Sequence, residues 1–165
     1  MSNVMRQKMI DKADVWDQLA AGVGCPFDDD RPASSEHWDK VASLSISTLY
    51  LHKIQTYRGY SLLVYDGAHA TRLDQLPKSA AAEFMSDLVR AQAAIVAVLK
   101  PDHVNVELLG NAIPHLHWHL VPRYRGDPRW GQPIWMTDEQ STPRVLLPEP
   151  LRVSLITSLR GALAV

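Results

Sequence analysis

Residues 105–123 read NVELLGNAIPHLHWHLVPR, and the second half of this segment alternates strictly between two kinds of residue. His115, His117 and His119 alternate with three large apolar residues, which are Leu116, Trp118 and Leu120. A period of two predicts a half-buried β-strand, because successive side chains of a strand point to opposite faces of the sheet. One face would carry three imidazoles, and the apolar face would suit a core.

Three imidazoles on one strand face indicate chemistry rather than packing. With seven histidines in 165 residues, random placement would give this spacing in roughly one chain in a hundred. Neighbours on one face lie about 7 Å apart, so a metal site would use two of the rings plus ligands from elsewhere. A central ring that attacks, flanked by two rings that hold the reacting group, suits the arrangement better.

The residues around this motif point to one family. His115-Leu-His117-Trp-His119-Leu-Val fits the pattern His-φ-His-φ-His-φ-φ, where φ is hydrophobic, and so resembles the histidine triad (HIT) family. Gly110-Asn111, Pro122-Arg123 and the upstream segment Arg58-Gly-Tyr-Ser-Leu-Leu-Val64 are also similar to that family. The resemblance covers residues 25–125 and implies a HIT-like fold that forms a homodimer.

Length, charge and hydropathy predict one globular domain. We expect a single domain over residues 1–165, with a motif-bearing core over 25–125 and a C-terminal extension over 126–165. The net charge of −1 provides no basic surface for nucleic acid or for a membrane. No apolar run approaches the ~20 residues that span a bilayer, and the N-terminus lacks a signal-peptide core. We therefore predict a cytoplasmic protein.

The periodicities predict an α+β chain in which helices pack on an antiparallel sheet. The strongest helix is the one over 79–99, because its apolar residues recur at helical spacing and Pro101 ends it. The expected order is a helix over 7–20, paired strands over 41–52 and 59–65, the long helix, strands over 103–109 and at the motif, and a C-terminal helix over 148–165.

The resemblance implies a nucleotide hydrolase or nucleotidyl-transfer enzyme. His117 would attack the α-phosphorus of a nucleotide and form a covalent nucleotidyl-histidine, which water would then cleave. His115 would orient His117 through a hydrogen bond, and His119 would help to neutralise the phosphoryl oxygens. Which outer histidine protonates the leaving group stays open. No cofactor is expected to be required.

Four further residues are candidates for binding the substrate. Asn111 could contact the phosphate through its amide, Gly110 marks a turn or a close backbone approach, and Asn105 is a weaker candidate. In the family, a polar residue at the position of His52 often contacts the ribose. An exposed histidine at a strand end is the equal alternative for His52.

Two departures bear on the substrate. Family members that transfer nucleotidyl groups carry glutamine at the third triad position, whereas this chain has His119, which implies a hydrolase. The substrates would be nucleoside phosphoramidates, dinucleoside polyphosphates or similar conjugates. Many hydrolases place a Ser or Thr hydroxyl just before the first histidine, but residues 111–114 read Asn-Ala-Ile-Pro. If that hydroxyl protonates a leaving amine, phosphoramidates are poor substrates here.

A metal site is not expected. Some HIT proteins hold a structural zinc with a Cys-x-x-Cys pair, but this chain has Cys25 followed by Asp28. The run Asp28-Asp-Asp30 is interpreted as a solvated acidic turn, and His69 as a loop residue. Two tryptophans, Trp130 and Trp135, are expected to anchor the C-terminal extension, and lining the nucleotide site or a dimer contact is the alternative.

Two rival functions come from other classes. One is a metal-dependent β-domain enzyme that uses two of the triad histidines. The other is a nucleotide-binding module without turnover, whose sequence would look the same if only a minor donor were lost.

Overall fold

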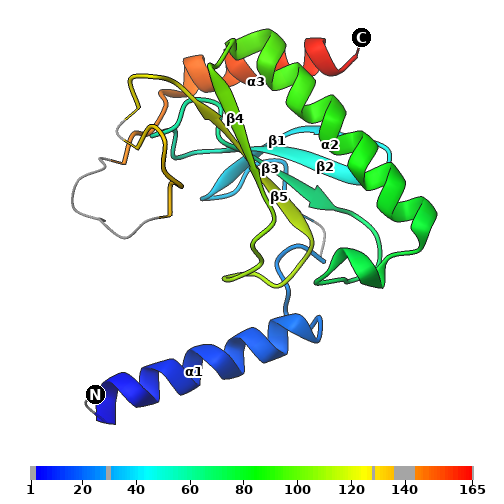
Figure 1. Ribbon diagram of the computed structural model, residues 1–165, viewed down its shortest axis with the longest axis vertical. Coiled ribbons are helices and arrows are strands. Elements are labelled where there is room, and N and C mark those ends of the chain that lie inside the picture. The colour runs from blue at the N-terminus through cyan, green and yellow to red at the C-terminus, as the bar shows by residue number, and fades with distance from the viewer. Residues whose placement is uncertain (1–2, 29–30, 128, 136–143, 165) are drawn as a thin grey trace.

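A five-stranded antiparallel sheet lies at the centre of the fold, with the strand order β1-β2-β3-β5-β4 (Figure 1). The computed structural model describes residues 3–28, 31–127, 129–135 and 144–164. The strands are β1 (Trp38–Ser43), β2 (Ser47–His52), β3 (Ser61–Tyr65), β4 (His103–Glu107) and β5 (His117–Arg123). The helices are α1 (Asn3–Ala20), the short 3-10 helix η1 (Leu73–Gln75), α2 (Lys78–Leu99) and α3 (Glu149–Leu163). The predicted α+β class and its antiparallel sheet are confirmed.

The long helix α2 and the C-terminal helix α3 cover one face of the sheet (Figure 1). The alternation within the strands explains why. Leu49, Leu51, Leu63 and Leu120 point into a core shared with both helices, whose contributions include Phe84, Ile95 and Leu159. Leu116 and Trp118 belong to this same core, so the apolar face predicted for the histidine motif is confirmed. Burying such side chains stabilises the fold by about 1.5–3 kcal/mol each.

The opposite face of the sheet carries a smaller cluster. Tyr50, Leu62 and Val64 alternate with the helix-facing residues and pack against Cys25 and Phe27 from the segment after α1. This segment therefore crosses the open face of the sheet. Helix α1 itself projects away from the body on that side (Figure 1).

The prediction of one strand over 41–52 is wrong, because the segment folds into the hairpin of β1 and β2. The buried carboxylate of Asp87 on α2 fixes the turn between them. It accepts hydrogen bonds from the backbone N–H groups of Ser45 and Ile46 at 3.2 and 3.0 Å, and from the Ser47 hydroxyl at 2.7 Å. Without Asp87 these donors would have no acceptor beside the core, and a buried donor without an acceptor costs free energy. Among the described residues, no helix is long and apolar enough to cross a membrane.

Candidate active site

His117 and His119 lie next to each other on the open face of β5. Strand β3 pairs with β5 so that Val64 lies opposite His117 and Leu62 lies opposite His119. Side chains two residues apart on a strand share a face, and here the two Nε2 atoms are 3.1 Å apart. Both rings line a cavity of about 450 Å³.

A backbone contact determines which nitrogen of His117 carries a hydrogen. Its Nδ1 lies 2.7 Å from the carbonyl oxygen of His115, which can only accept, so Nδ1 must carry the hydrogen. The Nε2 atom of a neutral ring then holds a free lone pair. This lone pair is directed to the side of the ring where His119 and the cavity lie.

Burial keeps the rings around the cavity neutral. It lowers the pKa of His117, and it lowers the pKa of His119 to about 3 with help from the neighbouring His117 and His52. The pKa of His52 is lowered by burial as well. A neutral imidazole is the nucleophilic form, so either ring could act as a nucleophile at neutral pH.

Apolar and aromatic side chains form most of the cavity wall, and they come from five separate segments. Phe27 and Trp38 lie on one side, and Tyr60 and Trp135 lie on the other, where each contacts His119. Such walls suit a flat heterocycle. Trp135 thus follows the alternative weighed from sequence, whereas Trp130 lines a different cavity.

The structure brings three of the four candidate binding residues to this cavity. Gly110, Asn111 and His52 line it, and Gly110 adopts a positive φ of 65°. The ring of His52 stacks on Tyr60 with centroids 5.0 Å apart. Asn105 lies elsewhere: its amide donates to Glu107 at 3.2 Å, and it lines the cavity that contains Trp130.

His115 does not share the cavity with the other two triad rings. It precedes β5, is only 2% exposed, and turns its ring beneath Phe27, which makes edge contacts with both His115 and His117. Its Nε2 donates to the carbonyl oxygen of Tyr65 at 2.9 Å. His115 therefore orients His117 through its backbone carbonyl and not through its imidazole.

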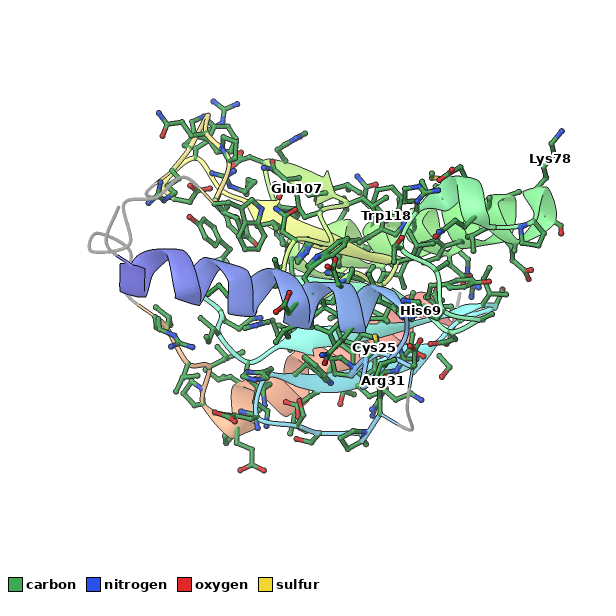
Figure 2. All side chains as sticks on the ribbon, turned by 90° about the horizontal axis from the view of Figure 1, so that it is seen from below. Cys25, Arg31, His69, Lys78, Glu107 and Trp118 are labelled. Atoms are coloured by element: carbon green, nitrogen blue, oxygen red, sulfur yellow. The ribbon has the colours of Figure 1, made fainter. Side chains whose placement is uncertain are left out.

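The ring of His115 belongs to a second cluster, with Cys25, Asp28 and His69. Their ligand atoms all lie within 4.8 Å of one another. Figure 2 shows Cys25 and His69 close to the C-terminal end of α1. Asp28 is not a free member of an acidic turn, because its carboxylate lies 3.1 Å from Nδ1 of His115 and 2.6 Å from Nδ1 of His69. Residues 29 and 30 of that turn lie outside the described part of the chain.

The four ligand atoms of this cluster could hold a cation. His69 donates from Nε2 to the carbonyl oxygen of Ala20 at 3.2 Å, as His115 does to Tyr65. In neutral rings both Nδ1 lone pairs then face the Asp28 carboxylate, which is itself only an acceptor. A metal ion between them would satisfy all three, and Zn²⁺ takes sulfur, imidazole and carboxylate ligands. Burial raises the pKa of the Cys25 thiol, so metal binding would have to displace its proton.

Several of these residues carry little signal in the sequence. His69 and Asp28 lie 41 residues apart, and only the fold brings them together. In the sequence, Tyr60 is conspicuous only as part of the family-like segment 58–64. In the structure its hydroxyl lies 2.8 Å from Nδ1 of His119. A tyrosine before a strand has no spacing that would identify this contact.

Comparison with known proteins agrees with the fold and the histidine motif. The HIT domain model matches residues 40–126, which is more than half of the chain, and the chain therefore belongs to the HIT family. None of the curated proteins compared with the chain matches it.

Solved structures of histidine triad proteins share the fold. One from Bradyrhizobium japonicum is 26% identical, with a TM-score of 0.71 over 78% of this chain and 92% of that one. One from Marinobacter aquaeolei is 24% identical, with a TM-score of 0.69 over 78% and 90%. A zinc-bound histidine triad family protein from Mycobacterium smegmatis is 20% identical, with a TM-score of 0.53 over 91% and 92%.

Proposed function

We propose that the chain cleaves the α-phosphate linkage of nucleotide conjugates, as a hydrolase or nucleotidyl-transfer enzyme, through a covalent nucleotidyl-histidine on His117. One observation carries the proposal. The Nδ1 of His117 is held by a backbone carbonyl at 2.7 Å, which leaves the attacking lone pair on Nε2, beside an aromatic-walled cavity. That arrangement positions the attacking atom before the substrate arrives, and positioning is most of what phosphoryl transfer requires.

The reaction would take two steps, which are the formation and the hydrolysis of the nucleotidyl-histidine. Nε2 of His117 donates its lone pair to the α-phosphorus while the bond from phosphorus to the leaving group breaks and that group takes the electron pair. The ring becomes positively charged, and the carbonyl oxygen of His115 stabilises the charged Nδ1–H. Water then attacks the phosphorus and gives up a proton to the solvent, His117 leaves as the neutral ring, and a nucleoside monophosphate is released.

Dinucleoside polyphosphates are the favoured substrates. A phosphate leaving group departs as a stable anion, whereas an amine needs a proton. No hydroxyl residue lies within residues 111–114, which precede the first triad histidine. Asn111 and Ala112 line the cavity at this point, and Asn111 can donate to a phosphoryl oxygen but is not an acid.

The metal suggested by the second cluster would be structural. Cys25, Asp28, His69 and His115 would hold it, and it would tie the segments before β1 and after β3 to the start of β5. The sequence predicts no metal, because the second thiolate is missing, but the four convergent ligand atoms support the opposite hypothesis. No catalytic step depends on it, so no metal is required for turnover.

We also propose that the chain acts in the cytoplasm as a homodimer. Helix α2 exposes a stripe of apolar side chains away from the core, namely Met85, Val89 and Val96. Strand β4 ends the sheet with one unpaired edge within the described residues. A partner subunit could pair with this edge and cover this stripe. Sedimentation at micromolar concentration checks the dimer, and a monomer would contradict it.

The first experiment measures release of nucleoside monophosphate by EDTA-treated protein. The substrates are diadenosine tri- and tetraphosphate, an adenosine phosphoramidate and the matching guanosine compounds. His117→Ala should lower kcat/KM by roughly 10⁴-fold or more, as removal of a nucleophile does. His103→Ala, which changes an exposed histidine on β4, is the matched control and should turn over normally.

Other outcomes would identify the rivals. Turnover that requires added metal would contradict the proposal and favour a metal-dependent enzyme that uses two triad histidines. Tight nucleotide binding without product, with every substrate, would favour a binding module.

A further inference from the structure

Tyr60 occupies a tightly fixed position beside the third triad histidine. It directly precedes β3, and its backbone carbonyl accepts hydrogen bonds from the N–H of His52 at 3.0 Å and from the Gln55 amide at 3.1 Å. Gly59 before it has a φ of 92°, and a Cβ there would meet Leu99 at 2.1 Å. The backbone therefore permits little movement of the Tyr60 ring.

Neighbouring rings also hold the ring of Tyr60 in place. The ring of His52 lies 5.0 Å from it at 18°, and the ring of His119 lies 6.0 Å away at 21°. Trp135 meets it edge-on at 6.3 Å, and the indole N–H of Trp135 donates to Glu107. A phenyl ring without the hydroxyl would keep all of these contacts.

The hydroxyl makes a separate contact, 2.8 Å from Nδ1 of His119. Burial raises the pKa of Tyr60, and the nearby carboxylate of Glu107 adds to this effect, so the hydroxyl keeps its proton. It has a single hydrogen to donate. His119 is neutral, since burial lowers its pKa to about 3, and a neutral imidazole has one N–H.

These contacts place the single N–H of His119. If Nδ1 accepts from Tyr60, the hydrogen of His119 must be on Nε2, which lies 3.1 Å from Nε2 of His117. His117 has its own hydrogen on Nδ1, bonded to the carbonyl of His115. The hydrogen bonds then run in one direction from Tyr60 through His119 and His117, with one donor and one acceptor at each step.

The opposite tautomer of His119 would interrupt this series of hydrogen bonds. With the hydrogen on Nδ1, the two Nε2 lone pairs of His117 and His119 would face each other at 3.1 Å, and the Tyr60 hydroxyl would lose its acceptor. We propose that Tyr60 is a positioning residue whose hydroxyl holds His119 as the Nε2–H tautomer, so that a neutral N–H donor is directed at the reacting phosphoryl group.

This role fits the reaction in the resting and bound states. In the free protein the Nε2–H of His119 covers the lone pair of the nucleophile. When a nucleotide enters, the same N–H turns to a non-bridging oxygen of the α-phosphate, where negative charge gathers, and it frees the lone pair of His117. His119 then acts as an electrostatic donor and not as an imidazolium acid.

The direct test is imidazole ¹⁵N NMR on the full chain at pH 8, in which a protonated nitrogen and a bare one have distinct shifts. Wild-type His119 should show a hydrogen on Nε2 and none on Nδ1. Tyr60→Phe should give a mixture of tautomers or the Nδ1–H form. Tyr57→Phe is the matched control, because Tyr57 is buried nearby and, among the described residues, its hydroxyl has no partner.

The kinetic arm rests on the proposed function, whereas the NMR arm does not. Tyr60→Phe should lower kcat roughly 10–100-fold, the usual scale for the outer partner of a functional histidine, and leave KM nearly unchanged. Tyr57→Phe should change neither value. Absence of turnover in the wild type would contradict the proposed function, and the NMR result would still decide the role of Tyr60.

Two results would overturn the inference. One is a wild-type His119 with its hydrogen on Nδ1, which needs no variant and so does not depend on whether Tyr60→Phe folds. The other is a folded Tyr60→Phe protein in which His119 keeps the Nε2–H tautomer.

Discussion

His115 and His119 are the two outer histidines of one motif, yet they lie in opposite surroundings. His115 is sealed beneath Phe27 and turns its free nitrogen toward Cys25 and Asp28. His119 lies beside the cavity, and its two nitrogens meet Tyr60 and the nucleophile His117. The same side chain is thus a candidate metal ligand at one end of the motif and, in the proposed mechanism, a donor to the phosphate at the other.

The difference arises from where the strand begins. Strand β5 starts at His117, so His117 and His119 lie on the strand, whereas His115 lies before it. His115 lies two residues earlier, where Leu116 bonds to Tyr65 at the end of β3 and to Ala70 beyond it, and the ring of His115 lies under Phe27 beside Cys25. A motif that looks uniform in sequence therefore has two chemically separate halves, and substitutions at its ends should have different effects.

Of the substitutions at the two outer histidines, His119→Ala should have the larger effect on turnover. Removing a preorganised donor to a phosphoryl oxygen should lower kcat by roughly 10²–10³-fold. Thermal stability and metal content should stay near those of the wild type, since His119 lies outside the Cys25 cluster. We would measure steady-state kinetics, a melting curve and metal content on the same sample. A His119→Ala variant with normal kcat would contradict the proposed difference between His119 and His115.

His115→Ala should mainly reduce stability. The change removes a buried ring, its hydrogen bond to Tyr65 and one ligand atom, and should lower the free energy of unfolding by about 2–4 kcal/mol. The backbone carbonyl that holds His117 remains, so folded protein should keep much of its kcat. Urea unfolding and turnover at 15 °C measure both quantities, with His103→Ala as the histidine control. A stable variant without turnover would show that the imidazole of His115 takes part in the reaction.

Metal removal should distinguish the role of the His115 cluster from that of the His117 and His119 pair without any substitution. Protein purified without chelator should contain zinc at close to one ion per chain, and dialysis against a strong chelator should lower Tm while EDTA-treated protein still turns over at 25 °C. Cys25→Ser and Asp28→Asn should lower the metal content in the same assay. Protein that is fully metal-free as isolated, and that binds none on addition, would contradict the assignment of the cluster.

Low pH should destabilise the fold, but less than the substitutions and the metal removal described above. Burial lowers the pKa of His119 to about 3, whereas an unfolded histidine titrates near 6.5, so the unfolded chain binds more protons between these values. The free energy of unfolding should therefore fall as pH drops below about 6.5, by at most about 1.4 kcal/mol per pH unit from this residue. Urea unfolding at pH 7.5, 6.0 and 5.0 should show a shallower dependence for His119→Gln, and parallel curves would contradict the buried neutral ring.

The sequence predicts those features that depend on short-range periodicity. The alternation around His117 places Trp118 and Leu120 in the helix-covered core, and the apolar spacing over 79–99 corresponds to α2. The family pattern around the motif is confirmed by the HIT domain match. Each of these signals is contained within one element, where the backbone geometry alone determines which way a side chain points.

Features that depend on distant residues were not predictable. The hairpin of β1 and β2 depends on Asp87, about forty positions away, and the alternating serines of that segment look like one strand. The cluster of Cys25, Asp28, His69 and His115 joins three separate segments. The contact between Tyr60 and His119 joins the neighbouring strands β3 and β5, which are far apart in the sequence.

The central claim is that His117 becomes covalently nucleotidylated. We would mix EDTA-treated protein with diadenosine tetraphosphate, quench within milliseconds to seconds, and measure the mass of the intact chain and of its peptides. The account predicts an adduct of one adenosine monophosphate on the peptide that contains His117, formed before product accumulates and absent in His117→Ala. Product formed with no adduct at any time, together with turnover in His117→Ala, would contradict it.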